Sequence, residues 1–459
     1  KLSIIILAAG QGTRMNSARP KVLHPLGGRP LLAHVLDTAR TLQATDIHVV
    51  IGHGAGQVRE ELPDTDIHWV QQEPQLGTGH AVAQAMPAVP DENTVLVMYG
   101  DVPLISKQTL EPLCQMAAQG MAALLSAELD DPGGYGRILH HADGSICGIV
   151  EEKDATRKQR AIQEINTGFL AAPAARLRGW LEALDNDNAQ GEYYLTDVIA
   201  RAVTEGTSVR GITTDAIDEV MGINDRRQLA AQERCFQQRQ AEACLQAGVT
   251  LIDPSRFDLR GCLDAGQDVV IDINAVLEGR VTLGDRVSIG PNVYLRNATV
   301  GDDVTILANC VIEDAVIGAG SRIGPFARLR PDASLAAATH VGNFVEIKKS
   351  EIGEGSKINH LSYIGDTTIG RGVNIGAGTI TCNYDGANKH RTVIGNDVFI
   401  GSDTQLVAPV EVGDGATIGA GSTITHDAPA DELTLSRAAQ KTRSGWKRPV
   451  KQPVKQPKG

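Results

Sequence analysis

Residues 305–329 read TILANCVIEDAVIGAGSRIGPFARL and carry an aliphatic residue at about every sixth position. A period of six matches neither the 3.6-residue turn of a helix nor the alternation of a plain strand. It matches a prism with three flat sides, in which each hexapeptide supplies one short strand and one corner. This stretch therefore predicts a solenoid whose axis is filled by aliphatic side chains.

The same repeat continues in both directions, from Ile271 to Ile424. It pauses after Ile375 and resumes at Ile394, around an inserted segment, NYDGANK, at 383–389. We expect a left-handed parallel β-helix of hexapeptide repeats with one inserted loop. The aliphatic anchors are Ile271, Leu277, Leu283, Ile289, Leu295, Val300, Ile306, Ile312, Ile317, Ile323, Leu329, Leu335, Val341, Ile347, Ile352, Ile358, Ile364, Ile369, Ile375, Ile394, Ile400, Leu406, Val412, Ile418 and Ile424.

The part of the chain before the repeat alternates short apolar runs with helical segments. Ser3–Leu7, Ile47–Ile51 and Thr94–Met98 have the composition of buried parallel strands, and 30–41 and 79–86 that of helices between them. This alternation predicts a Rossmann-like α/β domain with helices on both faces of its sheet. Ligands of such sheets bind at the carboxyl ends of the strands.

These patterns divide the chain into four parts. We expect the α/β domain at 1–224, a linker helix with a thin apolar seam at 225–247, the β-helix at 248–434 and a tail at 435–459. The tail ends in a basic, proline-rich sequence, so its end is predicted to be mobile.

Bulk properties exclude several classes of function. Lys and Arg total 43 against 55 Asp and Glu, a net charge of −12, which is unfavourable for sequence-independent binding of nucleic acid. The apolar run at 2–9 is too short for a membrane span. Seven cysteines without a C-x-x-C pair indicate reduced thiols. We expect a cytoplasmic protein that binds neither membranes nor nucleic acid.

A glycine-rich segment, LAAGQGTR at 7–14, follows the first strand, and Pro20-Lys21 comes shortly after it. Glycines let backbone N–H groups approach a phosphate chain, and Arg14 and Lys21 would neutralise phosphates. A dinucleotide fingerprint would need glycine where Met15 stands, and the P-loop motif is absent. A bare G-x-G is usually only a turn. The complete string, G-x-G-T-R followed by P-K, resembles the signature of sugar-1-phosphate nucleotidylyltransferases.

Further matches to that family follow in order. Asp101 ends the third strand, where its carboxylate could hold Mg²⁺, although a loop carboxylate can also simply cap a turn. By resemblance, Asn224 is the second metal ligand. The resemblance implies a nucleotide and sugar site made of Leu7, Ala8, Ala9, Gly10, Arg14, Lys21, Gln72, Gly77, Thr78, Tyr99, Gly100, Asp101, Gly136, Glu151, Asn166 and Asn224.

The repeat region contains a second candidate site around the sequence NHLSYIGD at 359–366. A lone histidine on a solenoid is usually structural, but His360 stands close to Tyr363 in the sequence. Lys348 follows Arg330 by eighteen positions, and His360 follows it by thirty. These separations are roughly whole numbers of coils and predict that the three side chains stack on one edge of the prism.

From Leu7 to Arg437 the chain resembles the family of bacterial bifunctional N-acetylglucosamine-1-phosphate uridylyltransferases and glucosamine-1-phosphate N-acetyltransferases. The resemblance implies a homotrimer that uses acetyl-CoA, UTP and Mg²⁺ to make UDP-N-acetylglucosamine, a precursor of peptidoglycan and lipopolysaccharide. It implies that His360 is the catalytic base. It also implies an acetyl site of Arg330, Lys348, Tyr363, Asn374 and Lys389, with acetyl-CoA bound by Ala377, Asn383, Tyr384, Ser402, Ala420 and Arg437.

Three other functions fit parts of the pattern. A nucleotidylyltransferase with a purely regulatory solenoid would resemble ADP-glucose synthases, but it would not need His360 or the inserted loop. A non-catalytic initiation-factor subunit shares this domain order, but should lack intact Arg14, Lys21 and Asp101. A γ-class carbonic anhydrase would need three grouped histidines, and His340, His360, His390 and His426 show no such grouping in the sequence.

Overall fold

The computed structural model of the chain describes all residues except 452–459. The tail end that is predicted to be mobile lies largely outside the described residues. The chain forms two compact units. The first comprises Lys1–Ala243 together with Asp258–Gly261, and the second comprises Cys244–Phe257 and the residues from Cys262 onward.

The first unit is built on a nine-stranded sheet with the strand order β11-β7-β10-β6-β1-β4-β5, to which β8 and β9 are attached through β10. The three strands predicted from the sequence are confirmed as β1, β4 and β6, and β1 pairs in parallel with both others. Within the main strand order β10 runs antiparallel to both neighbours, and β8 adds antiparallel pairings with β10 and β9. The strands are β1 (Leu2–Ala8), β4 (Asp46–Ile51), β5 (His68–Gln71), β6 (Thr94–Tyr99), β7 (Ala122–Glu128), β8 (Gly136–His140), β9 (Ile146–Val150), β10 (Glu164–Pro173) and β11 (Val209–Thr213), and β2 (Pro25–Leu26) pairs apart from them with β3 (Arg29–Pro30).

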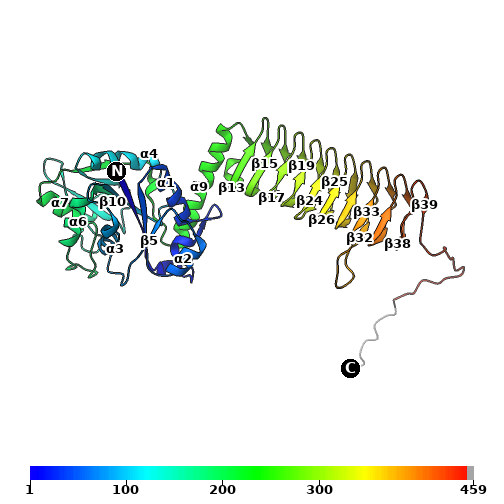
Figure 1. Cartoon of the computed structure of the whole chain (residues 1–459), viewed down its shortest axis with the longest axis horizontal. Coiled ribbons are helices and arrows are strands. Elements are labelled where there is room, and N and C mark those ends of the chain that lie inside the picture. The colour runs from blue at the N-terminus through cyan, green and yellow to red at the C-terminus, as the bar shows by residue number, and fades with distance from the viewer. Residues whose placement is uncertain (452–459) are drawn as a thin grey trace, which may run out of the picture. The chain divides into compact units, whose positions relative to one another are not determined.

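Helices cover both faces of this sheet (Figure 1). Ile4 and Ile6 of β1 pack in one apolar cluster with side chains of α1 and α4, whereas Ile5 and Leu7 pack in another with side chains of α3 and α6. The alternation of side chains along one strand thus builds two cores, as predicted for an α/β fold. The helices are α1 (Leu31–Thr41), α2 (Ala55–Glu61), α3 (Thr78–Ala85), α4 (Lys107–Ala118), α5 (Arg157–Arg160), α6 (Ala174–Glu182), α7 (Asp197–Thr204), α8 (Ile217–Val220) and α9 (Arg226–Gln246), and short 3₁₀ turns occupy Thr13–Met15, Lys21–Leu23, Met86–Ala88 and Pro254–Arg256.

The polar helix predicted after the α/β domain is α9. Its seam residues Leu229 and Phe236 pack against Leu26 and Leu31 of the first unit. The amide of Gln237 pairs with the backbone of Leu259 through two hydrogen bonds, of 2.7 and 3.2 Å. Most of the helix therefore belongs to the compact first unit. Among the described residues, no helix combines the length and the apolar composition that a membrane span requires.

The second unit is a parallel β-helix with three faces (Figure 1). An 11-stranded sheet forms one face, and a 17-stranded sheet turns a corner and forms the other two. The first sheet contains β12 (Thr250–Leu251), β14 (Val270–Ile271), β16 (Ser288–Ile289), β19 (Thr305–Ile306), β22 (Arg322–Ile323), β25 (His340–Asn343), β28 (Lys357–His360), β31 (Asn374–Ile375), β34 (Phe399–Ile400), β37 (Thr417–Ile418) and β39 (Leu433–Thr434).

The first strands of the larger sheet, β13 and β15, are long. The strands that follow are short, and each coil contributes two of them. It contains β13 (Phe257–Ala265), β15 (Ala275–Leu283), β17 (Tyr294–Arg296), β18 (Thr299–Val300), β20 (Val311–Glu313), β21 (Val316–Ile317), β23 (Arg328–Leu329), β24 (Ala333–Leu335), β26 (Glu346–Lys348), β27 (Ser350–Ile352), β29 (Tyr363–Gly365), β30 (Thr367–Ile369), β32 (Ile380–Cys382), β33 (Thr392–Ile394), β35 (Gln405–Val407), β36 (Val410–Val412) and β38 (Thr423–Ile424).

The hexapeptide anchors fill the axis of this solenoid, as predicted. Every anchor named above is buried, with at most 3% of its surface exposed. Ile306 stacks on Ile323 and Ile323 on Val341, so one coil advances the chain by seventeen positions and the next by eighteen. Ile369 instead stacks on Ile394, because the inserted loop lengthens that coil.

One position of the anchor ladder between Ile271 and Ile424 is polar. Thr381 pairs with Leu406 of the next coil and is completely buried. Its hydroxyl accepts a hydrogen bond from the Gly365 amide at 2.8 Å and donates one to the Gly365 carbonyl at 3.2 Å. These bonds offset the cost of burying a hydroxyl, and they explain why the aliphatic repeat appears broken in the sequence between Ile375 and Ile394.

Candidate active sites

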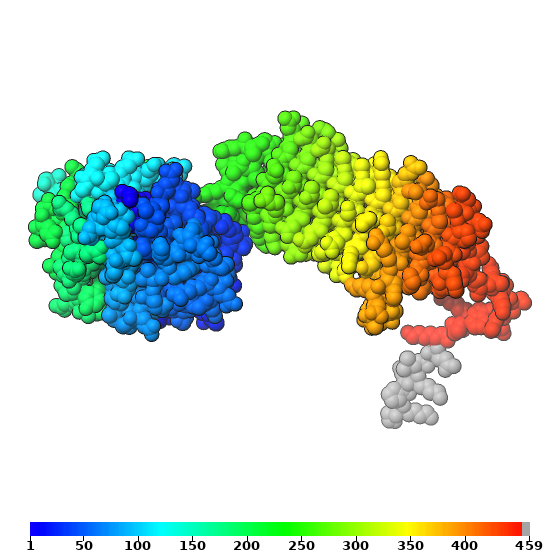
Figure 2. Space-filling model, in the orientation of Figure 1, coloured from blue at the N-terminus to red at the C-terminus, as the bar shows by residue number. Residues whose placement is uncertain are grey.

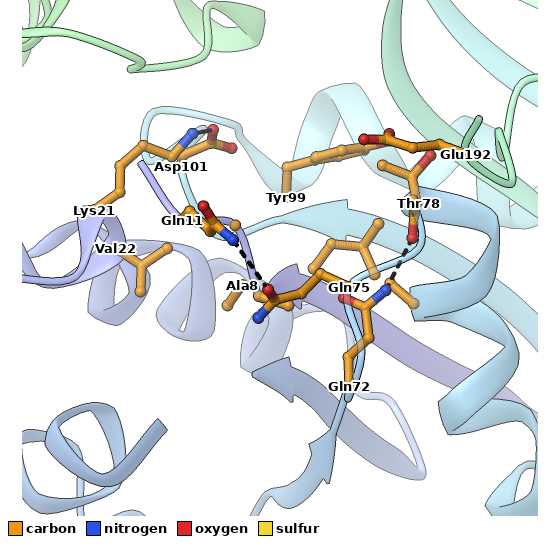
Figure 3. A pocket seen from close by; sticks show the side chains of 15 residues that line it. Ala8, Gln11, Lys21, Val22, Gln72, Gln75, Thr78, Tyr99, Asp101 and Glu192 are labelled. Carbon is orange, nitrogen blue, oxygen red and sulfur yellow. Dashed lines mark hydrogen bonds and ion pairs between the residues drawn. The ribbon is translucent and has the colours of Figure 1, made fainter. Parts of the chain in front are cut away.

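The first unit contains a cavity of about 470 Å³ at the carboxyl ends of β1 and β6, the position expected for a ligand of this fold (Figure 3). Its lining includes ten of the residues predicted from the sequence, namely Leu7, Ala8, Ala9, Gly10, Lys21, Gln72, Gly77, Thr78, Tyr99 and Asp101. It also includes five that the sequence did not indicate: Gln11, Val22, Gln75, Ala81 and Glu192.

Three of the predicted polar residues meet at one edge of this cavity. The ammonium of Lys21 donates to the carboxylate of Asp101 and, over 3.1 Å, to the amide oxygen of Asn224. Both Lys21 and Asp101 are largely buried, with side chains 13% and 17% exposed. A carboxylate and an amide oxygen thus converge on one cation. Oxygen atoms of this kind are also the ligands that Mg²⁺ prefers.

The segment that precedes α3 closes the opposite side of the cavity (Figure 3). The side-chain amide of Gln72 donates to the carbonyl of Gly77 at 3.0 Å, which ties the strand end to the loop. Gly77 has φ = +109°, and a Cβ there would lie 2.6 Å from the carbonyl oxygen of Tyr193. Only glycine fits this close approach. The Thr78 hydroxyl accepts from the amide of Leu195 at 3.1 Å, so a distant loop braces this side.

A more buried part of the site contains the residues predicted to contact the sugar. The Thr196 hydroxyl donates to the carboxylate of Glu151 at 2.9 Å, and burial raises the pKa of Glu151. Tyr99, Asn166 and Thr196 line a small cavity beside the main one. Gly136 pairs with Asn166 across the sheet. The site therefore offers carboxylate, amide and hydroxyl groups, which suit a polyhydroxyl ligand.

Two further predicted residues, Arg14 and Gly100, line neither the main cavity nor the small one. Arg14 lies in the exposed 3₁₀ turn Thr13–Met15. Gly100 packs instead behind the site, where a Cβ would meet Ala8, Leu32 and Val22 at 3.2–3.3 Å. Gly100 thus has a packing role in this arrangement.

The second unit carries two rows of predicted residues on two different corners of the prism. One row is formed by Arg330 and Lys348, which lie at the ends of the paired strands β23 and β26, and by Lys389 of the inserted loop. We call this row the cationic ridge. The contact with Lys389 lowers the pKa of Lys348, while Glu346 accepts from Arg330 at 2.8 Å. Closely spaced cations of this kind favour an anionic ligand.

The other row contains His360 and corrects the prediction that this histidine stacks with Arg330 and Lys348. His360 pairs with Asn343 at the end of β28, one face away from the cationic ridge. The thirty positions that separate it from Arg330 are not a whole number of coils of seventeen or eighteen. A ladder of backbone hydrogen bonds instead continues this corner from Asn343 through His360, Ala377 and Ser402.

We call this corner the histidine ridge. It consists of Asn343, His360, Ala377, Ser402 and Ala420, and the last three are residues predicted to bind acetyl-CoA. The guanidinium of Arg437, another of that set, donates to the carbonyl of Ala420 at 2.8 Å. The described structure thus brings together His360 and four predicted acetyl-CoA residues that are far apart in the sequence.

His360 itself is exposed and has one side-chain partner. Its Nδ1 lies 3.1 Å from the amide oxygen of Asn343. An amide oxygen can only accept, so Nδ1 carries a proton, and in the neutral ring the lone pair is on Nε2. Tyr363 in β29 lies on the face between the two ridges, and Asn374 in β31 lies on the face before the histidine ridge.

The inserted loop projects from the side of the solenoid (orange in Figure 2) and carries Asn383, Tyr384 and Lys389. Asp385 organises it: its carboxylate accepts from the backbone amides of Ala387 and Asn388 at 2.8 and 2.6 Å, and from the His390 ring at 2.7 Å. These bonds, of which that from Asn388 contributes most, lower the pKa of Asp385. Asp385 had no part in the sequence prediction.

No group of three or more metal-binding side chains occurs within the described part of the chain. The described histidines of the solenoid are accordingly not gathered into a three-histidine centre within one chain.

Domain families match both units. Residues 4–191 match the MobA-like NTP transferase domain, residues 260–337 match the GMPPB C-terminal domain, and residues 391–426 match the bacterial transferase hexapeptide repeat.

Relatives match nearly the entire chain. The bifunctional protein GlmU of Methylococcus capsulatus is 59% identical over 448 residues, which cover 97% of each chain. The bifunctional protein GlmU of Alkalilimnicola ehrlichii is 59% identical over 452 residues, 98% of this chain and 97% of that one. A solved nucleotidyl transferase from a Methanothermobacter species is 22% identical with a TM-score of 0.37, and covers 52% of this chain and 98% of its own.

Proposed function

The chain belongs to the GlmU family, and from this premise we propose the substrates, the residues and the assembly with which it works. As a member it is a bifunctional transferase, with a nucleotidyltransferase domain and a hexapeptide acyltransferase domain. The first alternative, a purely regulatory solenoid, and the second, a non-catalytic subunit, do not agree with this membership.

The proposed reactions form UDP-N-acetylglucosamine in two steps. The β-helix unit transfers the acetyl group of acetyl-CoA to the amine of glucosamine-1-phosphate. The α/β unit then transfers UMP from UTP to the resulting N-acetylglucosamine-1-phosphate and releases pyrophosphate. The product would serve the synthesis of peptidoglycan and lipopolysaccharide precursors, and we place the enzyme in the cytoplasm. The domain borders at 224/225, 247/248 and 434/435 remain part of this proposal.

In the uridylyl step, a phosphate oxygen of the sugar attacks the α-phosphorus of UTP and pyrophosphate leaves. Lys21 and Arg14 stabilise the negative charge that develops on the leaving group. Asp101 and Asn224 would hold Mg²⁺, which the Lys21 contact supports because the two oxygens already converge on a cation. When bound, Mg²⁺ would neutralise and orient phosphates. No protein nucleophile is needed when the reactants are held in line.

The remaining predicted residues of the first site position the two substrates. Gln72, Gly77 and Thr78 would hold the uracil base, and Glu151 and Asn166 would hold sugar hydroxyls. The hydrogen bonds that brace these groups support the proposal, because a site that is already ordered loses little entropy when the ligand binds.

In the acetyl step, His360 accepts a proton from the substrate amine as the amine attacks the thioester carbon and CoA leaves as its thiolate. Imidazole can accept a proton near neutral pH. The free lone pair of Nε2 supports this role, because Asn343 holds the proton on the other ring nitrogen. Arg330, Lys348 and Lys389 would bind the sugar phosphate, and Ala377, Ser402, Ala420 and Arg437, with Asn383 and Tyr384 of the loop, would bind acetyl-CoA.

We further propose a homotrimer in which each acetyl site lies between two subunits. His360 and the cationic ridge occupy different corners of one prism, so the histidine ridge of one subunit would face the cationic ridge of the next. An exposed apolar stripe beside the histidine ridge supports such an assembly. It consists of Phe326, Phe344 and Leu361, which are 49%, 56% and 62% exposed, and the two phenylalanine rings stack at 5.4 Å.

The observation that carries the proposal is the convergence of Lys21, Asp101 and Asn224 in one unit and of His360 with the acetyl-CoA residues in the other. Asp101→Ala should reduce uridylyl transfer by roughly 10²–10³-fold or more, and acetyl transfer should stay close to wild type. Each half-reaction is measured separately by product mass, with glucosamine-1-phosphate and acetyl-CoA or N-acetylglucosamine-1-phosphate, UTP and Mg²⁺.

A matched control is Asp215→Ala, which removes an exposed carboxylate of the same unit that lies outside the cavity lining. It should leave both activities unchanged. Equal loss of both activities in the Asp101 variant would contradict the division of labour.

A further inference from the structure

The Asp101–Asn224 pair already holds a cation of the chain itself. The ammonium of Lys21 contacts the side-chain oxygens of both residues. Asp101 and Asn224 are proposed to bind a metal, and Lys21 is proposed to bind phosphates, so the ammonium occupies the proposed metal position. We propose that Lys21 and the divalent cation alternate at this point, and that the triphosphate of UTP drives the exchange by drawing Lys21 into the cavity. This inference rests on the proposed uridylyl function and specifies its order of binding.

The exchange follows from electrostatics and from size. Mg²⁺ holds oxygen ligands at about 2.0–2.1 Å, so a metal bound to Asp101 and Asn224 would occupy nearly the place of the Lys21 ammonium. Two cations at that separation repel each other strongly in a site that is largely removed from water. Lys21 must therefore leave for the metal to bind with full affinity.

The backbone of Lys21 is fixed, so only its side chain can make this movement. Lys21 opens the 3₁₀ turn Lys21–Leu23, which is closed by hydrogen bonds from Leu23 to Pro20 and from His24 to Lys21 at 3.0 and 3.2 Å. Its Cβ packs against Gly12, where an added Cβ would lie 2.8 Å away. The flexible remainder of the side chain lines the cavity together with Gly10, where phosphates are expected.

The backbone segments that carry the two oxygen ligands, by contrast, are held in place independently of Lys21. The Ile223 amide donates to the carbonyl of Asp101 at 2.9 Å, which joins the two ligand-bearing segments. The Asn224 amide donates to the side chain of Gln228 in α9 at 2.7 Å. These hydrogen bonds do not involve Lys21, so the two ligand-bearing segments keep their positions when Lys21 leaves. The site is thus formed in advance, and it is neutralised by an internal cation until a nucleotide arrives.

The test measures the affinity of the full-length protein for Mn²⁺ in the absence of nucleotide, from the free Mn²⁺ signal in electron paramagnetic resonance. Lys21→Met should bind Mn²⁺ at least about tenfold more tightly than the wild type, within the range typical of coupled sites. Lys21→Gln, a polar replacement of similar length, should show the same direction. Far-UV circular dichroism checks that each variant is folded.

Two controls identify the site. Lys158→Met removes an exposed lysine of the same unit and should leave Mn²⁺ affinity at the wild-type value. Adding Asp101→Ala to Lys21→Met should abolish the gain. If the wild type and both folded Lys21 variants bind Mn²⁺ with equal affinity, Lys21 does not compete with the metal and the proposed exchange is wrong. The proposed uridylyl chemistry would not be contradicted by that result. A gain that survives the loss of Asp101 would overturn the exchange and the assignment of the metal site together.

Discussion

At the scale of single residues, the orientation of His360 decides what it can do. Because Asn343 accepts from Nδ1, the lone pair of Nε2 is directed away from that bond and is available to a substrate amine. His360→Ala should reduce acetyl transfer by roughly 10²–10⁴-fold. Uridylyl transfer and the binding of acetyl-CoA should persist, since neither uses the imidazole. Steady-state assays of both reactions, with acetyl-CoA titrated calorimetrically, measure these effects.

His426→Ala provides the matched control, because this histidine is exposed on the same solenoid and lies outside the histidine ridge. Normal acetylation by the His360 variant would make His360 a structural residue and would require another base.

The residues that line the cavity of the first unit differ in how well the sequence predicts them. The lining of the cavity in the first unit was predicted best at residues 7–10, where a glycine-rich string follows a strand and indicates a phosphate site. Glu192 and Gln75 were missed, since they reach the cavity from irregular loops whose course depends on tertiary hydrogen bonds such as that from Tyr193 to Leu76.

At the scale of elements, the six-residue period predicted the strands and the axis of the solenoid, because the anchor is the residue that must be buried in every coil. It did not predict which corner a residue such as His360 occupies. The corner depends on what remains after whole coils are subtracted: one coil of eighteen positions leads from Arg330 to Lys348, and the remaining twelve of the thirty positions carry His360 two faces further. The sequence and the family resemblance therefore identified the candidate side chains, and the spacing did not predict how they are arranged.

The inserted loop is the element whose order depends most on one side chain. Asp385→Ala removes the acceptor for Ala387, Asn388 and His390, so the loop should become mobile and Lys389 should lose its position. Misplacing a substrate-binding group in this way should lower kcat/KM for glucosamine-1-phosphate by roughly 10–100-fold, with uridylyl transfer unchanged. Kinetic assays of both reactions measure the effect. A variant with normal acetyl transfer would show that the loop does not need this order.

The pH dependence of this loop has a defined sign. The pKa of Asp385 is lowered in the folded loop, so its stabilising effect is fully present above the unfolded value of about 3.9 and is lost as pH falls toward the lowered pKa. The loop of the wild type should therefore stay ordered throughout the neutral range, and any loss of acetyl transfer between pH 6 and 8 has to come from another group.

At the scale of the whole molecule, two units with separate cores carry two chemistries. The first unit contains a complete cavity within one chain. The second displays its two ridges on different corners, and an exposed apolar stripe runs beside one of them. The first reaction should accordingly need only one subunit. The second should need neighbouring subunits, and a fully active monomeric solenoid would contradict that arrangement.

Mixed trimers test this difference directly. His360→Ala damages the histidine ridge and Lys348→Ala the cationic ridge, so each variant alone should be nearly inactive in acetyl transfer. If every site uses one ridge from each of two neighbours, random mixing in equal amounts leaves about a quarter of the sites intact, and co-expression should restore acetylation to about that fraction of the wild type. Mixing Arg330→Ala with Lys348→Ala should restore nothing, because both changes lie on the same ridge. Activity no higher than that of the separate variants, in trimers shown by mass to contain both subunits, would place the complete site within a single chain.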